Sequence, residues 1–254
     1  MKLLILKEVE SVNNTIVIHQ PNFLPRMKVF IKIAISDIWV IYDNVQYVRR
    51  EWQNRVFLRD SEQRPVLFTA PIEKADYFEK INNIKLKDTR SLNEHLYKHF
   101  QCNYSKAPYN KWVLDYLELL IKETYNIFDL ASYNVSCMNI AFDLLGFKPE
   151  EKYSSKMGID STDRNGKLIE LCIKSNCTNY VCGSGGKTYI DEDVFKQAGI
   201  NIIYYDYSKI IQGDTYGLKD YRNNSFLDFI AYNGPDALYN LIIEEKKEQI
   251  KQYM

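Results

Sequence analysis

Thr15-Ile16-Val17-Ile18-His19-Gln20-Pro21-Asn22-Phe23-Leu24-Pro25 is the stretch that decides the fold of this chain. Its first four residues have the β-branched character of a strand, and they run directly into a histidine, two amide side chains and two prolines. The prolines fix φ at about −65° and hold the chain stiff where it leaves the strand. A loop that serves packing alone has little use for an imidazole and two amides. The stretch therefore predicts a strand that ends in a ligand-contacting loop.

Outward from this stretch, the first part of the chain alternates between short apolar runs and polar turns. The pattern predicts a helix over about 28–35 and a strand over 38–44. A hairpin is predicted next, with strands at 55–58 and 66–69. Another short strand is expected over 81–86.

The middle of the chain is predicted to be helical. Apolar residues at i, i+3 and i+4 indicate helices over 92–104 and 109–125. A third helix is expected from Asn134, as its N-cap, to Leu145, with Gly146 closing its C-terminal end.

The final third alternates between helices and strands again. Thr162 or Asp163 is expected to cap a helix there. The elements predicted after it are a strand at 179–182, a helix at 191–198, a strand at 200–207 and a closing helix at 235–254.

Alternation with short connections favours parallel strand pairing and hence an α/β fold. We predict a mostly parallel sheet in an open three-layer arrangement, with a β-hairpin and a helical middle segment. No repeat or Pro/Gly/Ser-rich linker divides the sequence, so one domain over 1–254 is expected. Its N-terminal α/β part covers about 14–90, its helical part about 91–150 and its C-terminal α/β part about 151–254.

Composition narrows the class of protein. Lys plus Arg number 33 and Asp plus Glu also 33, so the chain lacks the basic excess of proteins that bind nucleic acid. No run approaches the ~20 apolar residues of a membrane span. The five cysteines are an odd number without a CxxC pair, which fits a reduced cytoplasmic protein better than a disulfide scaffold or a zinc site.

His19 and Asp43 are the candidate catalytic pair. His19 follows the first predicted strand, where open parallel sheets place ligand contacts, and Asp43 lies at the end of the second. If these strands are parallel neighbours, the carboxylate can orient the imidazole and raise its basicity. The structural alternatives are a histidine bonded to a loop carbonyl and an Asx turn that closes the strand. Gln20, Asn22 and Gln46 join them as candidate binding residues.

A second candidate region is the segment Arg49-Arg50-Glu51-Trp52-Gln53-Asn54-Arg55. Guanidinium groups bind carboxylate or phosphate in a bidentate manner, and an indole offers a face on which a ring can stack. We expect Arg50 and Arg55 to bind an anion and Trp52 to stack on a base or sugar ring. Gln53 and Asn54 are expected to read hydroxyl groups. Plain surface charge is the alternative.

The turn Gly183-Ser184-Gly185-Gly186 lies between a predicted strand and a predicted helix. Such a turn can aim backbone N–H groups at an anion, although a plain tight turn fits about equally well. It matches neither GxxxxGK[ST] nor GxGxxG. Arg164, ahead of another helix, is available for the same anion. His95 and His99 have i, i+4 spacing, but no third ligand accompanies them and no metal site is predicted.

Together these segments resemble the WbqC-like family, which many bacterial O-antigen and other surface-polysaccharide gene clusters encode. The likeness spans roughly residues 14 to 235. It adds Tyr104 and a histidine that aligns with either His99 or His95, and we take His99 as the candidate binding residue. The sequence departs from the family pattern at Arg26 and Cys182. The segments that carry it are 18–25, 43–47, Arg50 with 52–55, Tyr104 with 107–109, 154–155, 162–164, Tyr180 with 183–186 and Tyr189, and 225–228 with 233–234.

The resemblance implies an enzyme that attaches an acyl or aminoacyl group to the amine of a nucleotide-linked amino sugar. In this interpretation no cofactor is required, and an acyl carrier protein or coenzyme A carries the donor group. Arg50, Arg55, Arg164 and the 183–186 turn would bind the pyrophosphate of the nucleotide sugar, while His19 removes a proton from the attacking amine. The sugar, the donor and the oligomeric state stay open, a homodimer included.

Two alternatives belong to other classes. The first is a nucleotide-dependent ligase or nucleotidylyltransferase, because the layout of strand, histidine loop, helix and strand more distantly resembles the pantothenate synthetase type. The two-histidine HxGH signature of those enzymes is absent here. The second is a non-catalytic accessory protein that binds a nucleotide sugar in a polysaccharide assembly system.

Overall fold

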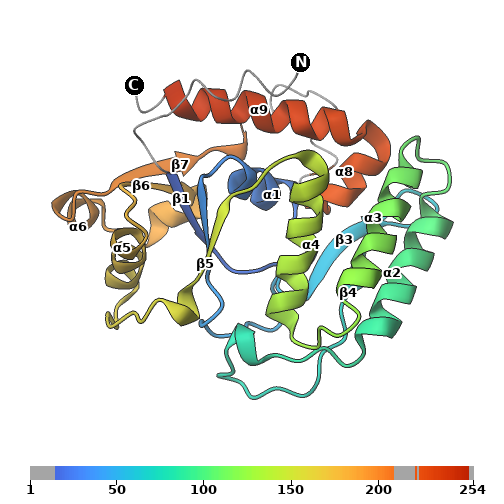
Figure 1. Cartoon of the computed structure of the whole chain (residues 1–254), viewed down its shortest axis with the longest axis horizontal. Coiled ribbons are helices and arrows are strands. Elements are labelled where there is room, and N and C mark those ends of the chain that lie inside the picture. Colours follow the sequence, from blue (N-terminus) through green and yellow to red (C-terminus); the bar gives the residue numbers. More distant parts are fainter. Residues whose placement is uncertain (1–14, 209–220, 222, 252–254) are drawn as a thin grey trace.

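The centre of the molecule is a five-stranded, wholly parallel sheet (Figure 1). The computed structural model describes residues 15–208, 221 and 223–251. The sheet order is β5-β2-β1-β6-β7, which confirms the predicted α/β class and parallel pairing. Its strands are β1 (Thr15–His19), β2 (Ile38–Ile41), β5 (Glu150–Tyr153), β6 (Asn179–Gly183) and β7 (Asn201–Tyr205).

Strand β1 is the middle strand and also the point at which the direction of winding changes. From β1 the chain moves outward to β2 and then β5, whereas β6 returns to the other side of β1 and continues to β7. Loops at the carboxyl ends of β1 and β6 therefore lead away from each other. A crevice between such loops is where open α/β sheets bind ligands.

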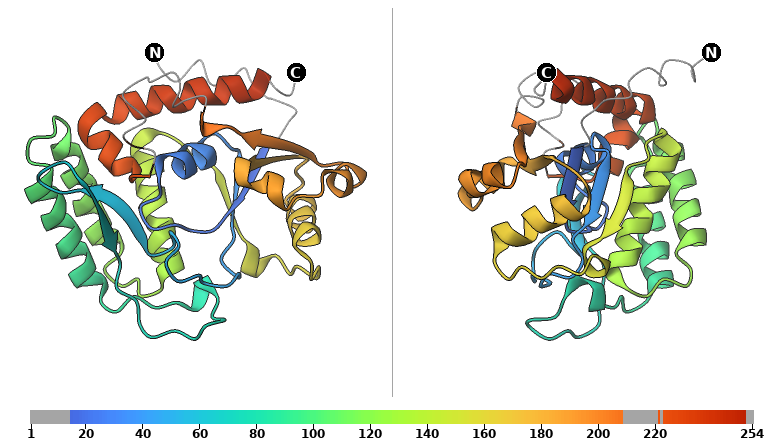
Figure 2. Two further views of the ribbon diagram at one scale, coloured as in Figure 1. Left: turned by 180° about the vertical axis from the view of Figure 1, so that it is seen from behind. Right: turned by 60° about the vertical axis from the view of Figure 1, so that its left-hand side comes forward.

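Helices cover both faces of the sheet (Figure 2). Helices α5 (Arg164–Lys174) and α6 (Glu192–Gln197) cover one face, where Leu171 and Phe195 share a buried cluster with Ile16 and Val40. The opposite face contributes Val17 and Trp39 to a much larger core. Helices that contribute to this larger core are α1 (Met27–Ala34), α4 (Leu130–Leu145), α8 (Phe226–Asn233) and α9 (Pro235–Lys251).

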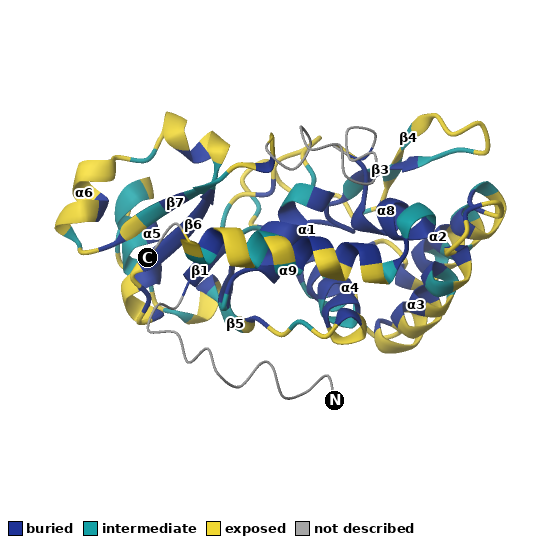
Figure 3. Ribbon diagram, turned by 90° about the horizontal axis from the view of Figure 1, so that it is seen from above, coloured by how far each residue is buried: buried dark blue, intermediate teal, exposed yellow. Residues whose placement is uncertain are grey.

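A helix-and-hairpin lobe extends the larger core. The antiparallel hairpin of β3 (Arg55–Arg59) and β4 (Pro65–Thr69) lies beside α2 (Thr89–Asn103) and α3 (Asn110–Glu123) on the right of Figure 1. In Figure 3, α9 crosses above the sheet and turns its exposed residues outward. In the described residues, no helix has both the length and the apolar composition needed to cross a bilayer.

Two predicted elements are wrong in ways that have a local cause. Residues 81–86 form a 3₁₀ turn, η1 (Ile81–Asn83), and single bridges instead of a strand, because their N–H groups bond to loop carbonyls such as that of Asp43. Helix α4 begins at Leu130 because the Asp129 carboxylate accepts from Ser132 N. Asn134, the predicted N-cap, lies one turn inside that helix and is fully buried.

Other boundaries differ by a few residues. Strand β2 ends at Ile41 instead of Asn44, and β7 ends at Tyr205 instead of Tyr207. Strand β5 and helix α8 were not predicted from the residue pattern. Of the predicted closing helix, residues 252–254 lie outside the described residues. Two further short 3₁₀ turns are η2 (Ser154–Lys156) and η3 (Ser184–Thr188).

Candidate functional site

A cavity of about 320 Å³ opens at the carboxyl ends of β1, β6 and β7. It lies at the change of winding direction between β1 and β6, the position expected for a ligand site. We call it the switch-point cavity. Its lining consists of Ile18, His19, Arg26, Lys28, Val29, Lys32, Tyr180, Cys182, Gly183, Ser184, Gly185, Gly186, Tyr189, Tyr205 and Tyr207.

A second, larger cavity of about 620 Å³ lies at the opposite, amino-terminal edge of the sheet. Asp37 precedes β2 there, and Asp143, Glu150 and Glu151 also line the wall. Carboxylates in this number repel an anionic ligand. The switch-point cavity is therefore the better candidate for the anion binding that the sequence predicts.

His19 is the last residue of β1 and half-buried in the cavity wall. Its Nδ1 lies 2.8 Å from the carbonyl oxygen of Gln20, so the neutral ring donates from Nδ1 and keeps its lone pair on Nε2. Burial, and then the positive charges of Lys32, Arg26 and Lys28, lower the pKa of His19 to about 3. The imidazole is neutral at physiological pH.

Three basic side chains reach the cavity from one short segment. Arg26 precedes α1, and Lys28 and Lys32 follow one helical turn apart, which places both lysines on the same helix face. No Asp or Glu accompanies them in the cavity wall that the described residues form. The cavity thus has a net positive lining and suits an anionic group.

Glycines of the 183–186 turn let these groups approach the backbone of β6. A Cβ placed on Gly183 would lie 3.9 Å from Lys32 Nζ, which puts the ammonium beside the turn. A Cβ on Gly186 would overlap Cys182 Sγ, so any larger residue there would force the Cys182 side chain to shift. The turn becomes η3 from Ser184 onward, and Gly183, Ser184 and Gly185 line the cavity together with His19.

The loop after His19 is held in place by the 52–54 segment. Gln53 Nε2 donates to Gln20 Oε1 at 2.8 Å, and Phe23 N donates to the Trp52 carbonyl at 3.2 Å. Asn134 Nδ2 from α4 bridges the two segments, because it donates to both the Pro21 and Gln53 carbonyls at 2.9 and 2.7 Å. Gln20 and Gln53 thus bond to each other, and they fix the loop.

Asp43 does not pair with His19, which corrects the prediction that it orients the imidazole. One carboxylate oxygen accepts from Ser154 Oγ and Ser155 N, both at 3.0 Å, and the other accepts from Ser155 Oγ at 2.7 Å. These serines follow β5, which is the neighbour of β2 on the side away from β1. His19 Nδ1 instead hydrogen-bonds to the Gln20 carbonyl oxygen. This is the alternative in which the histidine bonds to a loop carbonyl.

The Arg-rich segment does not gather in the cavity as predicted. Arg50 is exposed on a turn with φ of 70°, and Arg55 is half-buried at the start of β3, near Tyr47. The buried side chain of Asn54 bonds at both ends, donating to the Ala70 carbonyl and accepting from Tyr47 OH. Both polar atoms of this amide are therefore occupied by partners within the protein.

Trp52 connects this segment to the cavity indirectly. The guanidinium of Arg26, which lines the cavity, lies 4.1 Å from the centre of the Trp52 ring. One face of the indole is therefore occupied by an arginine of the protein itself, in a cation–π contact.

Asn22 and Gln46 lie outside the cavity wall. Asn22 is buried in the β1 loop, and Gln46 Nε2 donates to the Tyr77 carbonyl at 2.7 Å. Arg164 begins α5 with its guanidinium 4.7 Å from the ring centre of Tyr189, a cavity residue, so it lies at the margin of the site.

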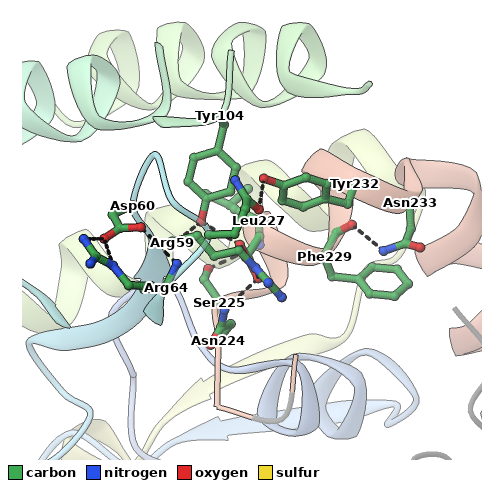
Figure 4. A network of polar contacts seen from close by, with 12 residues as sticks. Arg59, Asp60, Arg64, Tyr104, Asn224, Ser225, Leu227, Phe229, Tyr232 and Asn233 are labelled. Carbon is green, nitrogen blue, oxygen red and sulfur yellow. Dashed lines mark hydrogen bonds and ion pairs between the residues drawn. The ribbon is translucent and has the colours of Figure 1, made fainter. Parts of the chain in front are cut away.

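Tyr104 belongs to a separate polar network between the hairpin, α2 and α8 (Figure 4), and His99 borders the same network. Tyr104 OH donates to the fully buried Asp228 at 2.6 Å and accepts from Arg59 N at 2.7 Å. Arg59 Nε also contacts both Asp228 oxygens, at 3.2 and 3.1 Å. His99 Nε2 lies 3.1 Å from the Arg59 carbonyl. This network joins three elements, and none of its members lines the cavity.

Lys32 is the functional candidate that sequence reasoning missed. It is the one charged residue in the run Val29-Phe30-Ile31-Lys32-Ile33-Ala34-Ile35, whose remaining side chains are all apolar. A charge within an apolar helix is costly unless a partner or ligand meets it, so the run carried a usable signal. Tyr205 and Tyr207 gave no comparable signal, since tyrosines are frequent throughout this chain.

Comparisons with known proteins agree with the resemblance. The chain is 27% identical to a Mycobacterium tuberculosis (strain ATCC 25618 / H37Rv) protein named "Uncharacterized protein Rv1507c", over 210 residues that cover 82% of this chain and 85% of that one. No solved structure gives a significant match. A model of the WbqC-like protein family matches residues 20–240. Because this match includes most of the sequence, the chain belongs to the WbqC-like protein family.

Proposed function

We propose that this protein transfers an acyl or aminoacyl group to the amine of a nucleotide-linked amino sugar, with the switch-point cavity as its active site. One observation carries the proposal: a neutral imidazole, His19, shares a cavity with three cations and no described carboxylate. The cations suit the diphosphate of a nucleotide sugar, and the imidazole supplies a proton acceptor next to it.

In the proposed reaction the sugar amine attacks the acyl carbonyl of an activated donor. A C–N bond forms, the bond from the acyl carbon to its carrier breaks, and the amine proton passes to His19 Nε2. The imidazole of the free protein is a weak base because Lys32, Arg26 and Lys28 oppose its protonation. A bound diphosphate offsets those charges, so the nucleotide sugar itself raises the proton affinity of the ring.

The test is the pair His19→Gln and His95→Gln. Loss of the proton acceptor should lower kcat by about 10²–10⁴-fold. Binding of the nucleotide sugar should stay within about threefold of wild type, because the cations remain. His95 is exposed on α2 and serves as the matched control, with wild-type turnover expected. An equal loss of turnover and binding in His19→Gln would remove His19 from the proton transfer.

The nucleotidylyltransferase alternative has one observation in its favour. A histidine ends the first strand of the sheet, and the helix that follows carries cavity lysines. The layout offers a histidine and cations to the phosphates of ATP as well. Incubation with ATP separates the two, because a nucleotidylyltransferase or ligase releases AMP or pyrophosphate and the acyl transferase releases neither. Tight binding of a nucleotide sugar without product from any donor would favour the accessory protein.

A further inference from the structure

Lys32 is an anomaly in the fold because no residue that the structure describes forms an ion pair with its charge. The residue is buried, with 8% of its surface exposed, and it lines the switch-point cavity. Among the described residues it forms no hydrogen bond or ion pair through Nζ. A lysine that is largely removed from water without a counter-charge is costly to the fold. Folding alone therefore does not account for a lysine at this position.

The neighbouring Lys28 increases that cost, because its like charge lowers the pKa of Lys32 further. Lys28 approaches it from the preceding turn of α1, and His19 faces it from β1. Cys182 and Gly183 face it from β6. None of these groups is a carboxylate. The described surroundings of Lys32 are complementary to an anion that enters the cavity.

We propose that Lys32 is the phosphate-binding residue of the switch-point cavity and that its buried charge selects ligands with a diphosphate group. A ligand with a single carboxylate would leave the lining of Arg26, Lys28 and Lys32 in positive excess, whereas a diphosphate brings charge of similar size. This inference deepens the proposed function and rests on it for the identity of the complete ligand. It also means that Lys32 lowers the stability of the free protein and raises its affinity for the diphosphate ligand.

The experiment compares Lys32→Met with Lys187→Met, using inorganic pyrophosphate and uridine diphosphate as probes. Lys187 follows the same turn, is exposed and lies outside the cavity lining. Lys187→Met therefore removes one positive charge, as Lys32→Met does, but leaves the cavity lining unchanged. Lys32→Met should raise the Tm of the free protein by about 4 °C or more, because methionine suits a buried position. The same variant should bind pyrophosphate and uridine diphosphate at least about tenfold more weakly. Lys187→Met should change neither value appreciably.

Lys32→Gln provides a second variant that is tolerated where methionine is not, and it should lose the same affinity. Wild type that gains no Tm with either probe, or a Lys32→Met protein that binds both probes as wild type does, would overturn the inference. Free phosphate as a third probe separates the sources of the anion: a diphosphate-selective site binds pyrophosphate more tightly than phosphate. Lys32-dependent binding without acyl transfer to any amino sugar would uphold this inference and refute the proposed function.

Discussion

At the scale of single residues, the site depends on His19 and Lys32, whose pKa values both lie below the ordinary values for their residue types. Burial, with the neighbouring charges, lowers the pKa of His19 to about 3, and burial lowers the pKa of Lys32 to about 8. Both shifts arise mainly from burial, and neighbouring cations that no described carboxylate of the cavity wall balances add to them. Buried polar side chains that lower the stability of the free protein are typical of binding sites, because a bound ligand supplies the partner that they lack.

The shifted pKa of His19 predicts a pH-dependent stability. The folded-state pKa, about 3, lies below the ordinary value of 6.5, so between these limits the unfolded chain binds the proton more readily. Stability of the free protein should therefore fall as the pH decreases from about 6.5 toward 3. The imidazole keeps partial exposure in an open cavity, so His19 should account for about 1–3 kcal/mol of that loss.

Urea unfolding of wild type and His19→Gln across this range measures the effect. The free energy of unfolding should depend less steeply on pH in the variant than in wild type, with His95→Gln behaving as wild type. Identical slopes for His19→Gln and wild type would mean that the histidine titrates as it does in the unfolded chain.

At the scale of elements, single buried side chains join segments far apart in sequence. Asn134 of α4 holds the loop after β1 against the 52–54 segment through one amide nitrogen. Tyr104 and Asp228 hold the hairpin against α2 and α8. The Asn134 hydrogen bonds support the loop between His19 and the cavity residue Arg26, and the Tyr104–Asp228 hydrogen bond supports the helix-and-hairpin lobe. Different substitutions should separate their contributions.

Asn134→Ala should destabilise the protein by about 2–3 kcal/mol, because two buried carbonyls lose their donor at once. The change should also loosen the loop that bears Gln20 and weaken pyrophosphate binding. Denaturant unfolding and a pyrophosphate titration measure the two effects. Ser136→Ala, on the same helix at a half-buried position, is the control and should change stability far less. Wild-type stability in Asn134→Ala would show that the bridge is dispensable.

Tyr104→Phe distinguishes a structural tyrosine from a substrate-binding one. The variant loses the hydrogen bond to Asp228 and leaves Arg59 N without its acceptor, so a loss of about 1–3 kcal/mol is expected. Pyrophosphate affinity should stay within about threefold of wild type, since Tyr104 does not line the cavity. A large loss of affinity with unchanged stability would restore the substrate-binding role that the resemblance implied.

At the scale of the whole molecule, local sequence patterns predicted the individual helices and strands better than they predicted which of these elements lie side by side. The strand before His19, the hairpin and the alternating final third are all found in the structure. Strand order depends on contacts between distant segments, and no local pattern contains it. The predicted site was therefore divided: β6 brought the 183–186 turn to His19, whereas β5 brought its serines to Asp43. The lysine in the apolar run of α1 was the local signal for the cations.

The most direct test of this account is a crystal structure of the protein with a nucleoside-diphosphate-linked amino sugar. We expect the diphosphate in the switch-point cavity within hydrogen-bonding distance of Lys32 Nζ, and the sugar amine directed toward His19 Nε2. Density for the ligand on the surface around Arg50 and Trp52, or in the acidic cavity beside Asp37, would contradict the account.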